Sequence, residues 1–229
     1  MELCKGFTAA KWRKLRTRLP SDEKAWPEAI SVFQNRMMER YFKCIQLLLA
    51  GDDESHAKPI VPGFAIMALC CLVAETLQSF YDGGIHPSES RSACDYQTTG
   101  KCVREPSTAR TLKEFLKNSC HFNKDFKNSE ICGDFSQGVR NALLHEAETR
   151  KGWLIEKTRP VGKILSGKHG KYVLNRTNFH VALMAEFEDY LTKLKSPANR
   201  QLRENFLTKM DGLCLAEPQT KSRTEAPLR

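Results

Sequence analysis

The sequence has no long hydrophobic run and no secretory signal pattern. Its longest apolar stretch, Phe64–Ala74, is eleven residues long and is followed at once by Glu75. A membrane-spanning helix needs about 20 predominantly apolar residues. The N-terminus also lacks a basic stretch followed by an apolar core, which a secretory signal would show. These absences predict a cytoplasmic protein without membrane contact, in which the apolar stretch belongs to a buried core helix.

Several motifs of enzyme and metal chemistry are absent too. There is no Gly-rich loop ending in Lys-Ser or Lys-Thr, and no Gly-x-Ser-x-Gly sequence. The nine cysteines include no pair at the spacing of about two to four residues that zinc sites commonly use. We therefore predict no metal and no cofactor, with reduced, unpaired thiols as in a cytosol. The alternative is a zinc site formed by four separated cysteines, Cys94, Cys102, Cys120 and Cys132.

Acidic residues are in the minority, and the excess basic charge is clustered. The chain has 36 Lys plus Arg against 27 Asp plus Glu in 229 residues, a net charge of +9. Residues 1–19 hold six bases and one acid, and residues 150–176 hold eight bases and one acid. Clusters of this kind indicate a polyanionic partner, with nucleic acid first, although a solvated basic surface is the simpler alternative.

The hydrophobic periodicity predicts an all-α helical bundle with one small β-hairpin insertion. Residues 1–24 are expected to be a basic N-terminal arm, and residues 25–212 the helical domain. Apolar residues recur every three or four positions for about six turns after Pro27, and a second, more buried helix is expected from Gly63 to about Tyr81. Short apolar runs separated by Gly and Pro predict the hairpin at about 152–175, and residues 213–229 are expected to be disordered.

The most informative segment is a predicted helix from about Asp134 to Glu148. At 100° per residue, one face of this helix is apolar and the opposite arc is polar. The apolar face comprises Phe135, Val139, Ala142 and Leu143, and the polar arc includes Gln137, Arg140, Asn141, His145 and Glu148. Glu146 does not fit this pattern except through pairing with a base.

The polar arc contains the groups that a metal-free phosphodiesterase requires. Arg140 offers a planar cationic fork for phosphate oxygens, and His145 can transfer a proton near neutral pH. Asn141 lies one turn before His145 and is expected to orient its imidazole. Because an Arg and a His at this spacing also occur by chance, an ordinary polar helix face is the alternative. For Glu75, a carboxylate in the most apolar helix, a salt bridge with Arg140 is one hypothesis, and exposure to solvent or pairing with another base is the alternative.

The segment Arg140-Asn141-Ala142-Leu143-Leu144-His145 resembles the motif of the HEPN superfamily (higher eukaryotes and prokaryotes nucleotide-binding domains). Ribonucleases of this family carry Arg, a polar residue, three or more others and then His on a helix of an all-α bundle. The segments Leu72–Leu77, Gly152–Ile155 and Leu202–Phe206 are also similar to a bacterial HEPN-like group. The resemblance covers roughly residues 28–212, and a β insertion after the motif departs from the minimal bundle.

The resemblance implies a metal-independent endoribonuclease with Arg140, Asn141 and His145 as its catalytic residues. Attack by the RNA 2′-hydroxyl would leave a 2′,3′-cyclic phosphate, and Arg150 and Lys151 are expected to hold substrate phosphates. The family also implies a homodimer with two facing motifs, and a role as a toxin or in anti-phage defence, sometimes with a nucleotidyltransferase antitoxin. The alternatives are a catalytically silent HEPN module that binds RNA or a protein, and a basic nucleic-acid-binding protein with an accidental motif.

Overall fold

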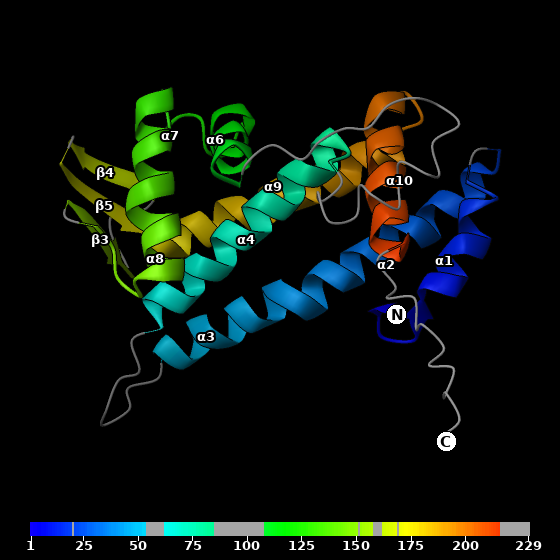
Figure 1. Ribbon diagram of the computed structural model, residues 1–229, viewed down its shortest axis with the longest axis horizontal. Coiled ribbons are helices and arrows are strands. Elements are labelled where there is room, and N and C mark those ends of the chain that lie inside the picture. Colours follow the sequence, from blue (N-terminus) through cyan, green and yellow to red (C-terminus); the bar gives the residue numbers. More distant parts are fainter. Residues whose placement is uncertain are drawn as a thin grey trace, which may run out of the picture.

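The computed structural model describes residues 1–19, 21–53, 62–84, 108–150, 152–157, 162–168 and 170–215 (Figure 1). In this part of the chain, long helices pack against one another around a shared core, and the sheet of β3, β4 and β5 lies at one end of the long axis. The elements are β1 (Glu2–Cys4), β2 (Phe7–Thr8), α1 (Ala9–Arg16), η1 (Glu23–Ala25), α2 (Trp26–Met37), η2 (Met38–Phe42), α3 (Lys43–Asp53), α4 (Gly63–Asp82), α6 (Thr108–Asn118), α7 (Ser129–Phe135), η3 (Ser136–Asn141), α8 (Ala142–His145), β3 (Trp153–Glu156), β4 (Leu165–Lys168), β5 (Lys171–Asn175), α9 (Arg176–Lys195) and α10 (Arg200–Leu215).

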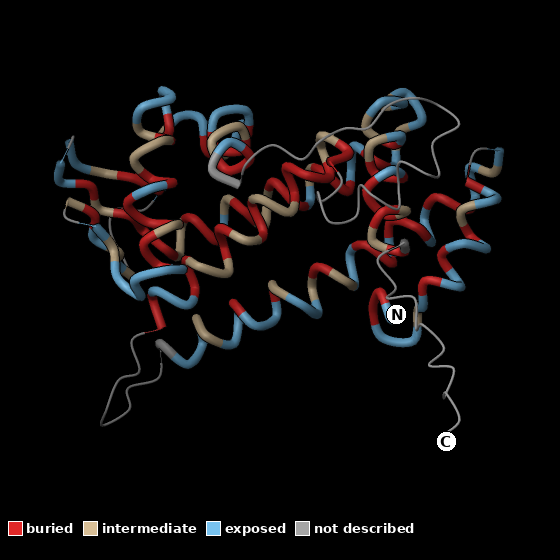
Figure 2. The backbone as a smooth tube through the Cα atoms, in the orientation of Figure 1, coloured by how far each residue is buried: buried red, intermediate tan, exposed pale blue. Residues whose placement is uncertain are grey.

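The predicted mostly helical fold and its central helix are confirmed. Helices α2 and α3 form one continuous rod through the π-helical turn η2, and α4 packs against α3, α6, α9 and α10. By length and composition alone α4 could cross a membrane, but 61% of its most apolar window is buried in the protein. The buried faces of these helices point inward along the whole bundle (Figure 2). Burial on this scale is typical of a core helix.

Aromatic rings from four helices make up the centre of the core. Phe33 of α2 contacts Phe80 of α4 with ring centroids 4.3 Å apart, and it contacts Phe206 of α10 at 5.6 Å. Tyr190 of α9 lies 5.8 Å from the same Phe33 ring. All four side chains are at most 1% exposed. Tilted and edge-to-face pairs of this kind contribute beyond the area they bury, so this cluster joins α2, α4, α9 and α10.

The N-terminal segment is part of this core, which corrects the predicted arm. Strands β1 and β2 pair antiparallel, and α1 follows with Trp12 fully buried. The Trp12 indole Nε1 donates to Asp211 of α10 at 2.8 Å, and Arg16 Nε donates to the same carboxylate at 2.9 Å. The prediction weighed the bases of this segment and overlooked that Leu3, Trp12 and Leu15 form a continuous apolar surface. Lys11, Arg13 and Lys14 of α1 are exposed, whereas Arg16 pairs with Asp211.

The C-terminal helix is also longer than predicted. Helix α10 continues to Leu215, beyond the expected domain end at 212, and Cys214 on it is only 3% exposed. The remainder of the expected disordered tail, residues 216–229, lies outside the described residues.

The insertion is a three-stranded mixed sheet rather than only a hairpin. The predicted hairpin is confirmed for β4 and β5, which pair antiparallel. The first strand, β3, lies on the other side of β5 and runs parallel to it, with Trp153 opposite Tyr172. The two rings are 4.7 Å apart and nearly buried. This ring contact favours the pairing of β3 with β5. The alternating pattern within each strand does not specify which strands pair.

Gly138 allows the sheet to approach the helix that carries the Arg-Asn-His motif. A Cβ at position 138 would lie 2.6 Å from Cδ1 and 2.7 Å from Nε1 of Trp153. We predict that Gly138→Ala lowers the free energy of unfolding by about 1–3 kcal/mol, the usual cost of overpacking a core. Urea denaturation would measure this loss. The matched control is Gly133→Ala, whose Cβ would meet only the flexible end of Lys113 at 3.3 Å. Equal stability of the two variants would contradict the prediction.

Candidate active site on the motif helix

The motif helix, defined as α7, η3 and α8 (residues 129–145), is one continuous rod that begins and ends with clear signals. The side chain of Asn128 caps its first turn by accepting the Ile131 N–H at 2.9 Å. The predicted apolar face is confirmed, because Phe135, Val139 and Ala142 are fully buried. The helix ends at His145, earlier than predicted, and Ala147 has a left-handed backbone with φ 54°. Glu148 therefore lies beyond the helix and not on its polar arc.

The middle of the motif helix is a π-helical turn, η3, which contains Arg140 and Asn141. At a regular 100° per residue, Arg140 would lie on the polar arc and face solvent. Arg140 is instead only 9% exposed. Two causes account for the difference. The wider turn changes the angular spacing of residues, and a carboxylate on α4 provides a buried partner for the guanidinium.

That partner is Glu75, so the structure selects one of the alternatives that the sequence left open. Arg140 Nε donates to Glu75 Oε1 at 2.6 Å, and Nη2 donates to Oε2 at 3.0 Å. The two side chains are 11% and 12% exposed. A bidentate arginine–carboxylate pair in such surroundings is short, directional and poorly screened. It therefore fixes the guanidinium plane and connects the motif helix to the central helix α4.

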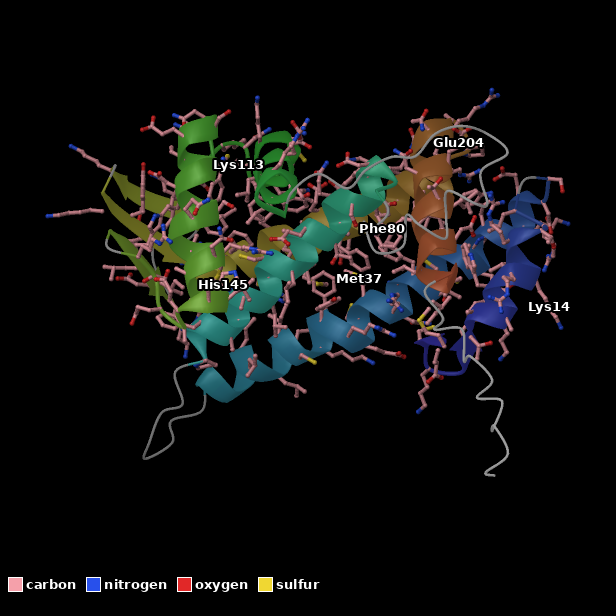
Figure 3. The ribbon with its side chains drawn as sticks, viewed as in Figure 1. Lys14, Met37, Phe80, Lys113, His145 and Glu204 are labelled. Carbon is pink, nitrogen blue, oxygen red and sulfur yellow. The ribbon has the colours of Figure 1, made fainter. Side chains whose placement is uncertain are left out.

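Asn141 contacts Arg140, and this corrects its predicted role. Its Oδ1 accepts a hydrogen bond from Arg140 Nη1 at 2.9 Å, and its Nδ2 lies 3.4 Å from Gln137 Oε1. Asn141 was predicted to orient the His145 imidazole, but the hydrogen bonds of the Asn141 side chain are with Arg140 and Gln137. His145 is exposed at the end of the motif helix, near the first turns of α4 (Figure 3). Asn141 consequently orients the arginine and not the histidine.

Arg150 lies beside the motif helix, held there by its backbone. Its N–H donates to Gly138 O at 2.9 Å, and its guanidinium contacts Glu146 at 3.4 Å in an exposed pair. The Glu146 carboxylate thus does pair with a base. Arg150 also lines a hollow of about 270 Å³ with Gln137 and Trp153. The other predicted phosphate-binding residue, Lys151, lies outside the described residues.

The two basic segments lie far apart. Helix α1 is at one end of the long axis, while the sheet within 150–176 is at the other end with the motif helix (Figure 1). Only the second segment can therefore supply charge near the motif.

The structure describes only two of the four cysteines of the zinc alternative, Cys120 and Cys132. Cys132 is 1% exposed, its thiol lies 3.7 Å from the carbonyl oxygen of Phe126, and burial raises its pKa. Cys120 is exposed, so these two thiols lie in different environments. Cys94 and Cys102 lie outside the described residues. Sequence reasoning missed a different grouping, in which Cys120 and the adjacent His121 approach Asp189 of α9. The Cys-His dipeptide was its only local signal, because Asp189 is 68 residues from His121.

Removal of only one partner of the Glu75–Arg140 pair should be strongly destabilising. We predict that Glu75→Gln lowers the free energy of unfolding by about 3 kcal/mol, because it leaves a buried guanidinium without a counter-charge. Replacing both partners with Met should recover most of this loss. The control is Glu146→Gln, which breaks the half-exposed pair with Arg150 and should change stability by about 0.5 kcal/mol or less. Chemical denaturation of all variants would measure these differences, and a loss from Glu75→Gln no larger than the control would contradict the prediction.

Comparison with known proteins identifies no relative of this chain. No model of a protein family, no curated protein and no solved structure matches the chain. Any function for the site therefore rests on the chemistry of its residues and on the resemblance of its short motif to the HEPN ribonucleases.

Proposed function

We propose that this protein is a metal-independent endoribonuclease of the HEPN type. The observation that carries the proposal is an immobilised guanidinium, Arg140, on the same helix as an exposed imidazole, His145. The first group can bind a phosphodiester and the second can move a proton. The π turn that holds Arg140 adds support, because such turns are frequent at functional sites.

The hydrogen bonds of Arg140 leave donors for a substrate. Arginine has five N–H groups, and within the described chain three of those of Arg140 contact Glu75 and Asn141. The other two can bind phosphate oxygens and stabilise the charge that develops in the transition state. Because Glu75 holds the guanidinium in place beforehand, little reorganisation is needed when RNA binds.

The proton transfers would fall to His145. As a general base it would take the proton of the RNA 2′-hydroxyl, whose oxygen attacks the adjacent phosphorus. The bond to the 5′-oxygen then breaks, which leaves a 2′,3′-cyclic phosphate and a 5′-hydroxyl end. That leaving oxygen needs a proton from a second group. A two-fold dimer would provide it as the partner's copy of the same histidine.

The biological setting follows from the resemblance. We propose a cytoplasmic toxin or anti-phage effector acting on RNA, restrained by an antitoxin or nucleotidyltransferase. Arg150, whose backbone is hydrogen-bonded to the motif helix, is placed to contact substrate phosphates beside the motif.

A second candidate function is a catalytically silent HEPN module that binds RNA or a protein. The specific observation in its favour is that Glu75 already balances the charge of Arg140. On this interpretation Arg140 only joins the motif helix to α4, and His145 is an ordinary surface residue. The two candidates differ in what conservative substitutions at these positions do.

We predict that His145→Ala reduces RNA cleavage by about 10²–10⁴-fold, the usual contribution of a general acid or base, without lowering the melting temperature, since the side chain is exposed. Arg140→Lys keeps the charge but loses the planar fork, so cleavage should fall by about 10²-fold. The control is Arg110→Lys, a change to an exposed arginine on α6. Cleavage of labelled RNA and thermal melting would be measured on the same preparations.

Cleavage should also survive EDTA, because no step assigned to the motif uses a metal. Full activity of His145→Ala, or abolition of cleavage by EDTA, would contradict the mechanism. If the wild type cuts no RNA under any condition, including with nucleotides or phage-derived triggers, the silent module is the better interpretation.

A dimer is the second requirement of the proposed chemistry. We predict a two-fold dimer with the motif helices facing each other, because each chain offers one histidine in the motif. Light scattering at micromolar concentration, with and without RNA, would measure the mass in solution. Mixing wild-type chains with an excess of His145→Ala chains should lower the activity per wild-type chain, because each mixed dimer has only one of the two histidines that the site requires. A strict monomer that cleaves RNA would contradict the shared site.

A further inference from the structure

A second cluster of chemically active side chains lies away from the motif helix. Cys120 and His121, in the turn after α6, approach Asp189 on α9. One ligand atom from each lies within 4.8 Å of the other two, and His121 Nε2 is 2.8 Å from Asp189 Oδ2. In the described part of the chain, no other group of three or more His, Cys, Asp or Glu side chains converges in this way.

The turn that carries Cys120 and His121 is attached to α9 by a buried carboxylate. Ser119 Oγ donates to Glu186 at 2.5 Å and also accepts the His121 N–H at 3.2 Å. Glu186 is 3% exposed and accepts a further hydrogen bond from Tyr81 at 2.8 Å. It lies one helical turn before Asp189. The same helix therefore both anchors the turn and supplies the third side chain, which is the preorganisation that a binding site requires.

The ligand set selects a class of ion. A thiolate, an imidazole and a carboxylate together suit Zn²⁺ and similar transition metals, whereas Mg²⁺ and Ca²⁺ prefer oxygen ligands. Zinc bond lengths of about 2.0–2.3 Å in a tetrahedron place neighbouring ligand atoms about 3.3–3.6 Å apart. The atoms here can reach that spacing by side-chain rotation, because Cys120 is exposed and the His121 and Asp189 side chains are 29% and 47% exposed.

The cluster also borders a groove. Cys120 and His121 line an open cavity of about 810 Å³ between α9, strand β4 and the segment that follows α6. Lysines line the same groove, namely Lys124, Lys127 and Lys163. Three protein ligands leave the fourth position of a tetrahedral ion to water or another small ligand. With three lysines and one aspartate, Asp125, in its lining, the groove has a net positive charge that favours anionic ligands.

We propose that Cys120, His121 and Asp189 bind a Zn²⁺-class metal ion at the rim of this groove. Binding replaces the proton of the Cys120 thiol with the metal and releases that proton to solvent, so affinity should fall as the pH is lowered. The site is independent of the motif. EDTA should remove this ion and leave cleavage by Arg140 and His145 unchanged.

The test uses the full chain, stripped with EDTA, kept reduced and titrated with Co²⁺ as the probe. Charge-transfer absorption from sulfur to cobalt reports a bound thiolate, and competition with Zn²⁺ gives the affinity. The titration is repeated in a Cys94→Ser, Cys102→Ser background so that these thiols cannot supply the signal. We expect one equivalent of Co²⁺ in both proteins, with an absorption band that shows a sulfur ligand.

Loss of a ligand should weaken binding more than the roughly 10–100-fold effect of an outer-shell partner. Cys120→Ser should abolish the charge-transfer band, and Asp189→Asn should weaken binding while keeping the band. The matched control is Cys44→Ser, which removes another exposed thiol and should change neither. Thermal melting without metal confirms that each variant folds. An unchanged band in Cys120→Ser, or no binding by the wild type at micromolar Co²⁺ and Zn²⁺, would overturn the proposal.

Discussion

The ion pair between Glu75 and Arg140 joins the motif helix to the central helix α4. Glu75 lies on α4, which packs against α3, α6, α9 and α10. Arg140 lies on the motif helix, which in turn carries the contact with the sheet through Gly138 and Trp153. A buried carboxylate without a counter-charge is costly. The pair therefore constrains how the motif helix lies against α4, and the sheet packs on that helix.

In the proposed mechanism, Arg140 has two roles with different requirements. As a structural group it needs only a positive charge near Glu75. As a phosphate-binding group it needs a planar fork with free N–H donors at the surface. The geometry serves both, because Glu75 and Asn141 occupy one part of the guanidinium and leave the rest. Structural and catalytic consequences of changing Arg140 must for this reason be separated by the choice of substituent.

Predictions from the sequence succeeded where a local pattern carried the information. The apolar stripe after Pro27, the buried run before Glu75 and the inward face of the motif helix each follow from spacing within one element. A carboxylate in the most apolar helix also indicated that Glu75 needs some partner, but the sequence did not name Arg140 as that partner. The expectations failed where the answer lay in another part of the chain. Trp12 donates a hydrogen bond to Asp211, and Cys120 lies close to Asp189. The partners in each contact are far apart in the sequence, so no local spacing predicts them.

The π turn in the motif helix makes the direction in which Arg140 points depend on the length of the segment before it. A π turn corresponds to one residue inserted into a regular helix, and one residue rotates everything beyond it by about 100°. The orientation of Arg140 relative to Phe135 therefore depends on the number of residues between them as well as on their identities. Two chains could share the letters Arg-Asn-x-x-x-His and present different faces of the helix to the solvent. In this fold, deletion of one residue within 136–139 would turn Arg140 relative to Phe135 without altering any residue of the motif.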